Sequence, residues 1–222
     1  MKKLLLLLLT GILSITLFAG CNNGTVPAEP AEQQRTDRYK RELIFDKEKL
    51  DTEKAAWETS GIKNYQFTLE YEFIDPRSLL KKITVRDGKL FSTEYYYSSS
   101  EYMFIDDVFN PEYYGEPADI EKIKKEDPSF YEFFFETSTF GQIKTINDVY
   151  AFIEKEYEEA KKIDLKEERI VKYVINSEYY DKYHVPFCFD SWILTERDLE
   201  EGLSVGDFCG WECMVLDFKV IE

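Results

Sequence analysis

The chain has 222 residues and is strongly acidic, with 28 lysine and arginine side chains against 44 aspartate and glutamate side chains. Such a surface repels nucleic acids and anionic lipid head groups, which argues against a DNA- or RNA-binding role. The length suffices for one sizeable hydrophobic core or two small ones.

The first 21 residues have the order of a bacterial lipoprotein signal. Lys2 and Lys3 precede an apolar run over residues 4–18, and Ala19-Gly20 leads directly into Cys21. With about 15 positions, the run is short of the ~20 residues that a retained membrane helix needs. We therefore expect removal of residues 1–20 and attachment of acyl chains, such as palmitate, to Cys21, rather than a plain cleaved signal. This predicts a domain anchored to a membrane in the bacterial cell envelope, outside the cytoplasm.

Residues 21–38 contain few bulky apolar side chains. Such a composition cannot bury enough surface to offset the entropy lost on ordering, so a disordered tether is predicted. A flexible chain of this length typically reaches about 20–25 Å. Residues 39–222 are predicted to form a single domain.

A helix is predicted over residues 39–60, followed by a strand over residues 65–73. Leu43, Leu50 and Trp57 recur every seven residues among charged side chains, which favours a helix. The following apolar residues alternate, which is typical of a strand with one buried face.

A β-hairpin is predicted next, because Asp87-Gly88 suits a two-residue type I′ turn between two apolar segments. The expected cross-strand pairs are Val85 with Leu90 and Thr84 with Phe91.

Residues 101–142 are interpreted as an irregular insertion, rich in acidic and aromatic side chains, with a short helix near residues 118–125. Aromatic rings more often pack in a core than form a ligand cage. Those of the insertion must nevertheless be buried against the domain or bind something. The candidate interaction surface comprises Tyr95, Tyr97, Tyr113, Tyr114, Phe133 and Phe135.

A second helix is predicted over residues 146–162, because Thr145 and Asp148 have the spacing of a capping box and apolar residues follow at three-and-four spacing. Three strands are predicted after it, at residues 169–179, 186–195 and 214–221. The fold class is therefore α+β, an antiparallel sheet with helices packed on one face, either as one continuous sheet or as two helix-plus-sheet halves. The expected core comprises Trp57, Tyr65, Phe67, Leu69, Val85, Leu90, Ile146, Val149, Ile153, Val174, Ile193 and Val215.

The cysteine content is consistent with an exported protein. With Cys21 lipidated, Cys188, Cys209 and Cys213 remain, which predicts one disulfide, of open pairing, and one free thiol. A zinc site is disfavoured because His184 is the one histidine of the chain and structural zinc takes four ligands. No metal and no other cofactor are predicted.

The sequence contains none of the common catalytic motifs. It has no Gly-x-Ser-x-Gly nucleophile elbow, no Gly-x-Gly-x-x-Gly dinucleotide-binding loop, no phosphate-binding loop and no His-Glu-x-x-His zinc-protease motif. His184 is interpreted as a structural residue, because a general base needs a nucleophile and an orienting partner within reach. The many carboxylates leave two alternatives open. One is a hydrolase that works with paired acids, and the other is calcium binding at Asp106-Asp107 or Glu126-Asp127, although neither has the spacing of a calcium loop.

Four segments of the chain stand in a recognisable order: Trp57 with residues 61–69, the hairpin at 83–90, the helix start at 145–150, and residues 183–186 before Asp190. Together they resemble the bacterial lipoprotein family called domain of unknown function 6174. The resemblance covers residues 57–220 without the insertion. It implies a small secreted or lipid-anchored α+β domain with no assigned activity. Unlike many relatives, this chain has no cysteine over residues 67–73, and its insertion is longer.

The sequence therefore predicts an envelope protein without enzymatic activity. Its membrane contact is the lipid on Cys21, and its partner is an unknown protein or small molecule that meets the aromatic and acidic surface.

Overall fold

The computed structural model describes residues 39–71, 79–99, 104–105, 108–203, 207–208 and 213–222. The described residues belong to one compact unit. The predicted signal, the tether and Cys21 lie outside the described residues.

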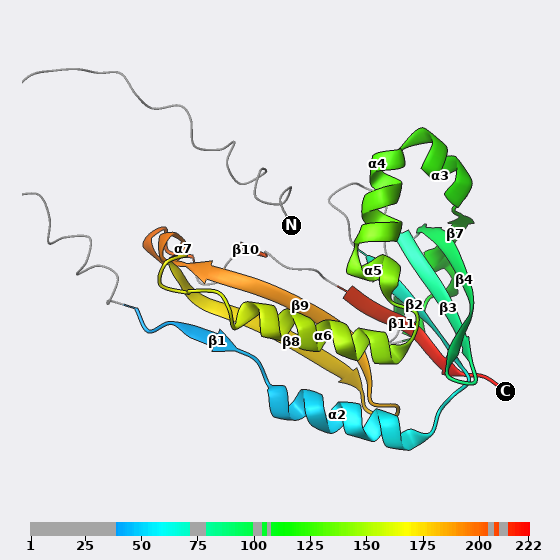
Figure 1. The fold of residues 1–222 in the computed structure, drawn as a ribbon, viewed down its shortest axis with the longest axis horizontal. Coiled ribbons are helices and arrows are strands. Elements are labelled where there is room, and N and C mark those ends of the chain that lie inside the picture. Colours follow the sequence, from blue (N-terminus) through cyan, green and yellow to red (C-terminus); the bar gives the residue numbers. More distant parts are fainter. Residues whose placement is uncertain (1–38, 72–78, 100–103, 106–107, 204–206, 209–212) are drawn as a thin grey trace, which may run out of the picture. The chain divides into compact units, whose positions relative to one another are not determined.

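The fold is α+β, as predicted, and its strands form one continuous sheet rather than two halves (Figure 1). Across the sheet the order is β1 (Glu42–Ile44), β8 (Ile170–Tyr180), β9 (Val185–Thr195), β11 (Cys213–Val220), β2 (Tyr65–Tyr71), β3 (Leu79–Arg86), β4 (Lys89–Ser98) and β7 (Tyr114–Pro117). The short β10 (Asp207–Phe208) also pairs with β9, and β5 (Phe104–Ile105) pairs with β6 (Val108–Phe109) apart from the sheet. Neighbouring strands run antiparallel, except that β1 runs parallel to β8.

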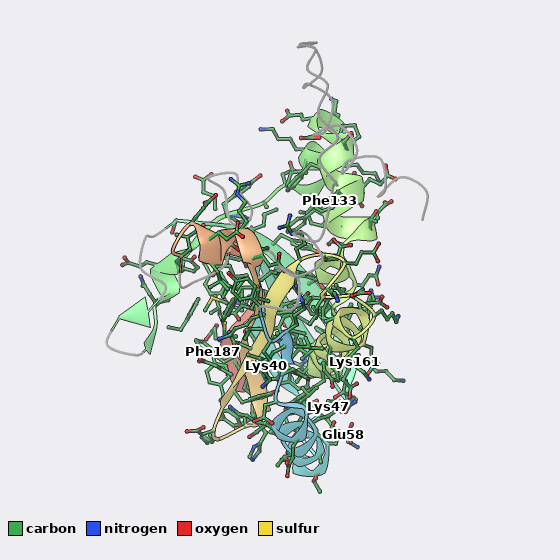
Figure 2. All side chains as sticks on the ribbon, turned by 90° about the vertical axis from the view of Figure 1, so that its left-hand side faces the viewer. Lys40, Lys47, Glu58, Phe133, Lys161 and Phe187 are labelled. Atoms are coloured by element: carbon green, nitrogen blue, oxygen red, sulfur yellow. The ribbon has the colours of Figure 1, made fainter. Side chains whose placement is uncertain are left out.

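The long helices α2 (Lys47–Ser60) and α6 (Ile146–Ala160) cover one face of the sheet, which we call the helix face. Their buried residues share one cluster with Tyr65, Phe67 and Leu69 of β2. In Figure 2, Lys47 of α2 and Lys161 next to α6 lie on one side of the strands, and Phe187 of β9 lies on the other. The opposite face carries a smaller cluster of Leu80, Tyr113 and Leu216.

The first helix begins later than predicted. Leu43 lies in β1, opposite Tyr173 of β8, and α2 begins only at Lys47 after the Asp46 side chain accepts a hydrogen bond from the Lys49 backbone. Leu50 and Trp57 are both buried on α2, as the seven-residue spacing predicts. Leu43 packs against the same core, but from a strand. A strand of three residues is too short to show a period of its own.

The β3–β4 hairpin has an irregularity that the sequence did not predict. Val85 pairs with Leu90 as expected, but Thr84 pairs with Ser92, so Phe91 is an extra residue in β4. Phe91 is 66% exposed; Leu90, despite its expected pairing with the buried Val85, is 40% exposed, so the prediction of Leu90 as a core residue is wrong. Ile193 is only half-buried, whereas the other predicted core residues are buried.

The second half of the chain follows the prediction closely. Thr145 and Asp148 form the predicted capping box at the start of α6, and β8, β9 and β11 lie within one residue of the predicted strand ends. The insertion, in contrast, is regular where it is described. It contributes η2 (Pro111–Tyr113), β7 and then four short helical elements, α3 (Ile120–Glu126), α4 (Pro128–Tyr131), η3 (Glu132–Thr137) and α5 (Thr139–Gln142). The last helix among the described residues is α7 (Glu196–Glu200).

Candidate functional site

The aromatic residues predicted to form one interaction surface lie in two places. Tyr113 and Tyr114 pack on the opposite face of the sheet, and Tyr95, Tyr97 and Phe135 pack on the helix face. The sheet therefore separates residues that the sequence grouped together. The two groups also differ in the contacts that their rings and hydroxyl groups make.

Tyr113 and Tyr114 act as structural polar contacts. The Tyr113 hydroxyl, on a buried side chain, donates to the buried Glu70 carboxylate. The Tyr114 hydroxyl hydrogen-bonds Thr68 and lies 3.2 Å from Oδ2 of Asp217. Burial raises the pKa of Tyr114 well above its ordinary value, so the phenol stays protonated.

On the helix face, Tyr95 and Phe135 contact each other with ring centroids 5.0 Å apart. Burial raises the pKa of Tyr95 to about 12. Phe133 differs, because it is 41% exposed and lies on the helical segment beyond the strands (Figure 2). Of the six predicted residues, Tyr97 lines a cavity and Phe133 has an exposed ring.

The cavity lies where α3 and α4 meet the β4–β7 edge of the sheet, and we call it the α3–α4 pocket. Its volume is about 360 Å³, within the range of small-ligand sites. It is lined by Leu79, Tyr97, Glu116, Pro117, Asp119, Lys122, Ile123, Glu126, Asp127 and Phe130.

Two helix caps place the acidic side of the pocket. Asp119 precedes α3 and accepts a hydrogen bond from the Lys122 backbone at 3.0 Å, and Asp127 precedes α4 and accepts one from the Phe130 backbone at 3.0 Å. Aspartate is favoured at this position because its side chain satisfies a free backbone N–H of the first turn. Pro128 then fixes the start of α4.

Close packing holds the pocket walls together. At Gly115 of β7 an added Cβ would lie 2.5 Å from the Tyr97 carbonyl oxygen, so only glycine lets β7 approach β4 this closely. Below the helices, Phe130 stacks on the buried Phe134 at 5.3 Å. Lys81 of β3 donates to the carbonyl of Ile143 at 2.7 Å and so ties the chain after α5 to the sheet.

The pocket combines an apolar floor with an acidic rim. Leu79 is 3% exposed, and the rings of Tyr97 and Phe130 complete the floor. The rim has four carboxylates and one ammonium group, that of Lys122. The carboxylates of Glu116 and Glu126 form no ion pair or hydrogen bond with the residues that the structure describes, so their charges are available to a ligand. Such a site attracts cations.

His184 lies elsewhere and makes structural contacts. Its Nδ1 is 2.8 Å from a carboxylate oxygen of Glu53 in α2, and its backbone carbonyl accepts a hydrogen bond from the buried Tyr150. Its backbone has φ +55°, at the turn between β8 and β9. No serine, cysteine or histidine lines the α3–α4 pocket.

The predicted disulfide finds no support in the described part of the chain, where no two sulfurs lie at bonding distance. Cys209 lies outside the described residues, and the register pairs Cys188 with Met214 and Cys213 with Phe189. The described residues also contain no group of three or more His, Cys, Asp or Glu residues arranged for a metal ion. Of the two calcium candidates, Asp106-Asp107 lies outside the described residues, and Asp127 is a helix cap.

Comparison of the chain with family models, with curated proteins and with solved structures gives no match. Among the described residues, no helix is long and apolar enough to cross a membrane.

Sequence reasoning missed most of the α3–α4 pocket. It identified Tyr97, the acidic character of the insertion and, near residues 118–125, the helix that is α3, but not the second helix start, at α4, which brings further carboxylates to the pocket. A signal was present: Asp119 and Asp127 each stand directly before a helical segment, the second of them before a proline.

Proposed function

We propose that this protein is a lipid-anchored binding module of the bacterial cell envelope, without catalytic activity of its own. Its ligand carries a cationic group on an apolar body and occupies the α3–α4 pocket. The observation that carries this proposal is the apolar floor of that pocket under a rim of four carboxylates.

The pocket chemistry supports a cationic ligand. An ammonium or guanidinium group placed between Glu116 and Glu126 would meet two carboxylates that have no partner among the described residues. The same cation could also lie over the face of Tyr97 or Phe130, an arrangement that stabilises cations near aromatic rings. An apolar body would displace water from the floor around Leu79. Lys122 would repel a second cation and so favour a ligand with one.

The signal sequence that ends at Cys21 and the resemblance to a lipoprotein family support a location in the cell envelope. Stable membrane anchoring takes two hydrophobic signals, and a diacylglyceryl group would supply both acyl chains at once.

The ligand class is testable with a small probe on the full-length chain in neutral detergent. We would titrate N-acetyl-phenylalanyl-arginine amide, and the same compound with neutral citrulline in place of arginine, and measure the dissociation constant by calorimetry. We expect the citrulline analogue to bind at least about tenfold more weakly, because a charged hydrogen bond contributes about 1.5–3 kcal/mol.

Variants locate the site. The double variant Glu116→Gln, Glu126→Gln should lose the arginine preference, whereas Glu121→Gln, an exposed residue of α3 outside the pocket, should keep it. Weakening of binding that is the same per charge removed in the two variants would show attraction by net charge alone and overturn the assigned site. Equal binding of the two probes would overturn the ligand class, and cleavage of either probe, followed by mass spectrometry, would contradict a non-enzymatic role.

A further inference from the structure

The outer edge of β4 is only partly paired. On its inner side β4 pairs with β3 from Lys89 to Tyr97. On its outer side, β7 pairs with β4 only at Tyr96 and Ser98, and the Ala118 N–H donates to the Tyr95 carbonyl at 2.8 Å. Within the described residues, the segment from Lys89 to Glu94 therefore has no strand on its outer side.

This free edge also exposes apolar side chains. Leu90 and Phe91 are 40% and 66% exposed, the latter being the largest exposed fraction among the large apolar residues described. An unpaired edge presents backbone N–H and C=O groups that another strand can bind, and exposed apolar side chains add to that tendency.

The register of the hairpin determines which side chains share a face along this edge. Lys89, Ser92 and Glu94 stand opposite Arg86, Thr84 and Lys82 of β3, respectively. These three β3 positions alternate along the strand, so they share one face, and residues paired across a sheet share a face too. Lys89, Ser92 and Glu94 therefore lie on the same face, with Phe91 as the extra residue between the first two.

We propose that this edge pairs antiparallel with the same edge of a second copy of the chain, about a two-fold axis that passes beside Ser92. In that register Lys89 of each copy lies opposite Glu94 of the other, and Ser92 lies opposite itself. Leu90 and Phe91 lie against Thr93 of the second copy. Because each copy uses the same surface, the association closes as a dimer and does not grow further.

Charge complementarity is the observation that selects a second copy as the occupant. Within one copy Lys89 stands opposite Arg86, a pairing of like charges that destabilises a sheet. Glu94 of the second copy would provide the missing opposite charge on the other side of Lys89. The dimer would therefore contain two Lys89–Glu94 pairs.

The interface is short, so the association is expected to be weak in dilute solution and favoured where two copies are held on one membrane. Protein interfaces of small area are typical of transient contacts, and confinement raises the effective concentration of the partner. The membrane should therefore be the setting of the test.

Cross-linking tests the two-fold register directly. The full-length chain with Ser92→Cys, expressed in bacteria, would be oxidised in isolated membranes and run on a non-reducing gel. We expect a disulfide-linked dimer well above the yield of the wild-type chain and of Thr52→Cys, an exposed position on α2. A yield no higher than these two controls would overturn the proposal.

Charge reversal gives a second test in the same Ser92→Cys background. Lys89→Glu alone and Glu94→Lys alone should each lower the dimer yield by at least about fivefold, since each creates two like-charged pairs across the axis. The combination of both substitutions should restore it. Equal cross-linking of Ser92→Cys alone, with either substitution and with both would show that the register is wrong. If one single variant fails to fold, recovery of the dimer yield in the combined variant supports the register, and no recovery overturns it.

Discussion

Arg41 and Glu196 form a buried ion pair that joins the start of the domain to its last helix. The Arg41 guanidinium donates to Glu196 and also to the carbonyls of Leu165 at 3.2 Å and Ile170 at 2.9 Å. Arg169 adds a second contact to Glu196 at 3.1 Å. The Glu196 side chain is only 3% exposed, so its charge is almost entirely compensated by protein groups.

Removing the charge of Glu196 should destabilise the fold. Glu196→Gln leaves the nearly buried Arg41 without its counter-charge, and we expect the free energy of unfolding to fall by about 3 kcal/mol. Urea denaturation of the full-length chain at pH 7 measures this loss. Glu201→Gln is the matched control, because its pair with Arg197 is exposed and contributes less than about 1 kcal/mol. Equal losses in the two variants would contradict the special role of Glu196.

The same carboxylate predicts an acid-sensitive contribution to stability. The hydrogen bond from Arg41, with help from Arg169, lowers the pKa of Glu196 below its ordinary value of 4.5. A lowered pKa in the folded state adds stability above the ordinary pKa, and this stability is lost as pH falls through the folded-state pKa. The difference in unfolding free energy between the wild-type chain and Glu196→Gln should therefore be constant at neutral pH and shrink below about pH 4.5. A difference that grows with acidification would refute the assignment.

Among the elements, β7 carries the outer wall of the α3–α4 pocket and depends on Gly115. In Gly115→Ala the new Cβ would meet the Tyr97 carbonyl, so β7 should separate from β4 and the Ala118 amide should lose protection from hydrogen exchange. Probe binding should weaken at least about tenfold. Gly61→Ala is the contrasting control: it strains the left-handed C-cap of α2, with φ +68°, and should lower stability while leaving probe binding unchanged.

The helices and strands differ in how well the sequence predicts them. Strong periodicity predicted α6 and β2, and the capping box of Thr145 was visible because both partners are local. The strand at Leu43 was not visible, since β1 exists only by pairing with β8, more than a hundred residues away. Pocket residues were missed for the same reason: Leu79 and Phe130 meet through the topology of the sheet, which no local pattern encodes.

For the whole molecule, the central prediction is the lipid anchor at Cys21. Growth of a bacterial host with tritiated palmitate should label the wild-type chain and Cys188→Ser but leave Cys21→Ser unlabelled. Cys188 is the appropriate control because it lies within the folded unit, in β9. Label that persists in Cys21→Ser would contradict lipidation at this residue.

The position of β1 has a mechanical consequence for an anchored receptor. β1 directly follows the predicted tether and is one edge of the sheet, whereas β7, beside the α3–α4 pocket, is the other. With strands about 4.8 Å apart, seven intervals separate the two edges by about 34 Å. A force between the membrane and a ligand held in the pocket would therefore act across every strand pair in series, entering the domain beside Arg41. Each strand pair in that series would carry the full load, so the weakest of them would limit the force that the folded domain withstands.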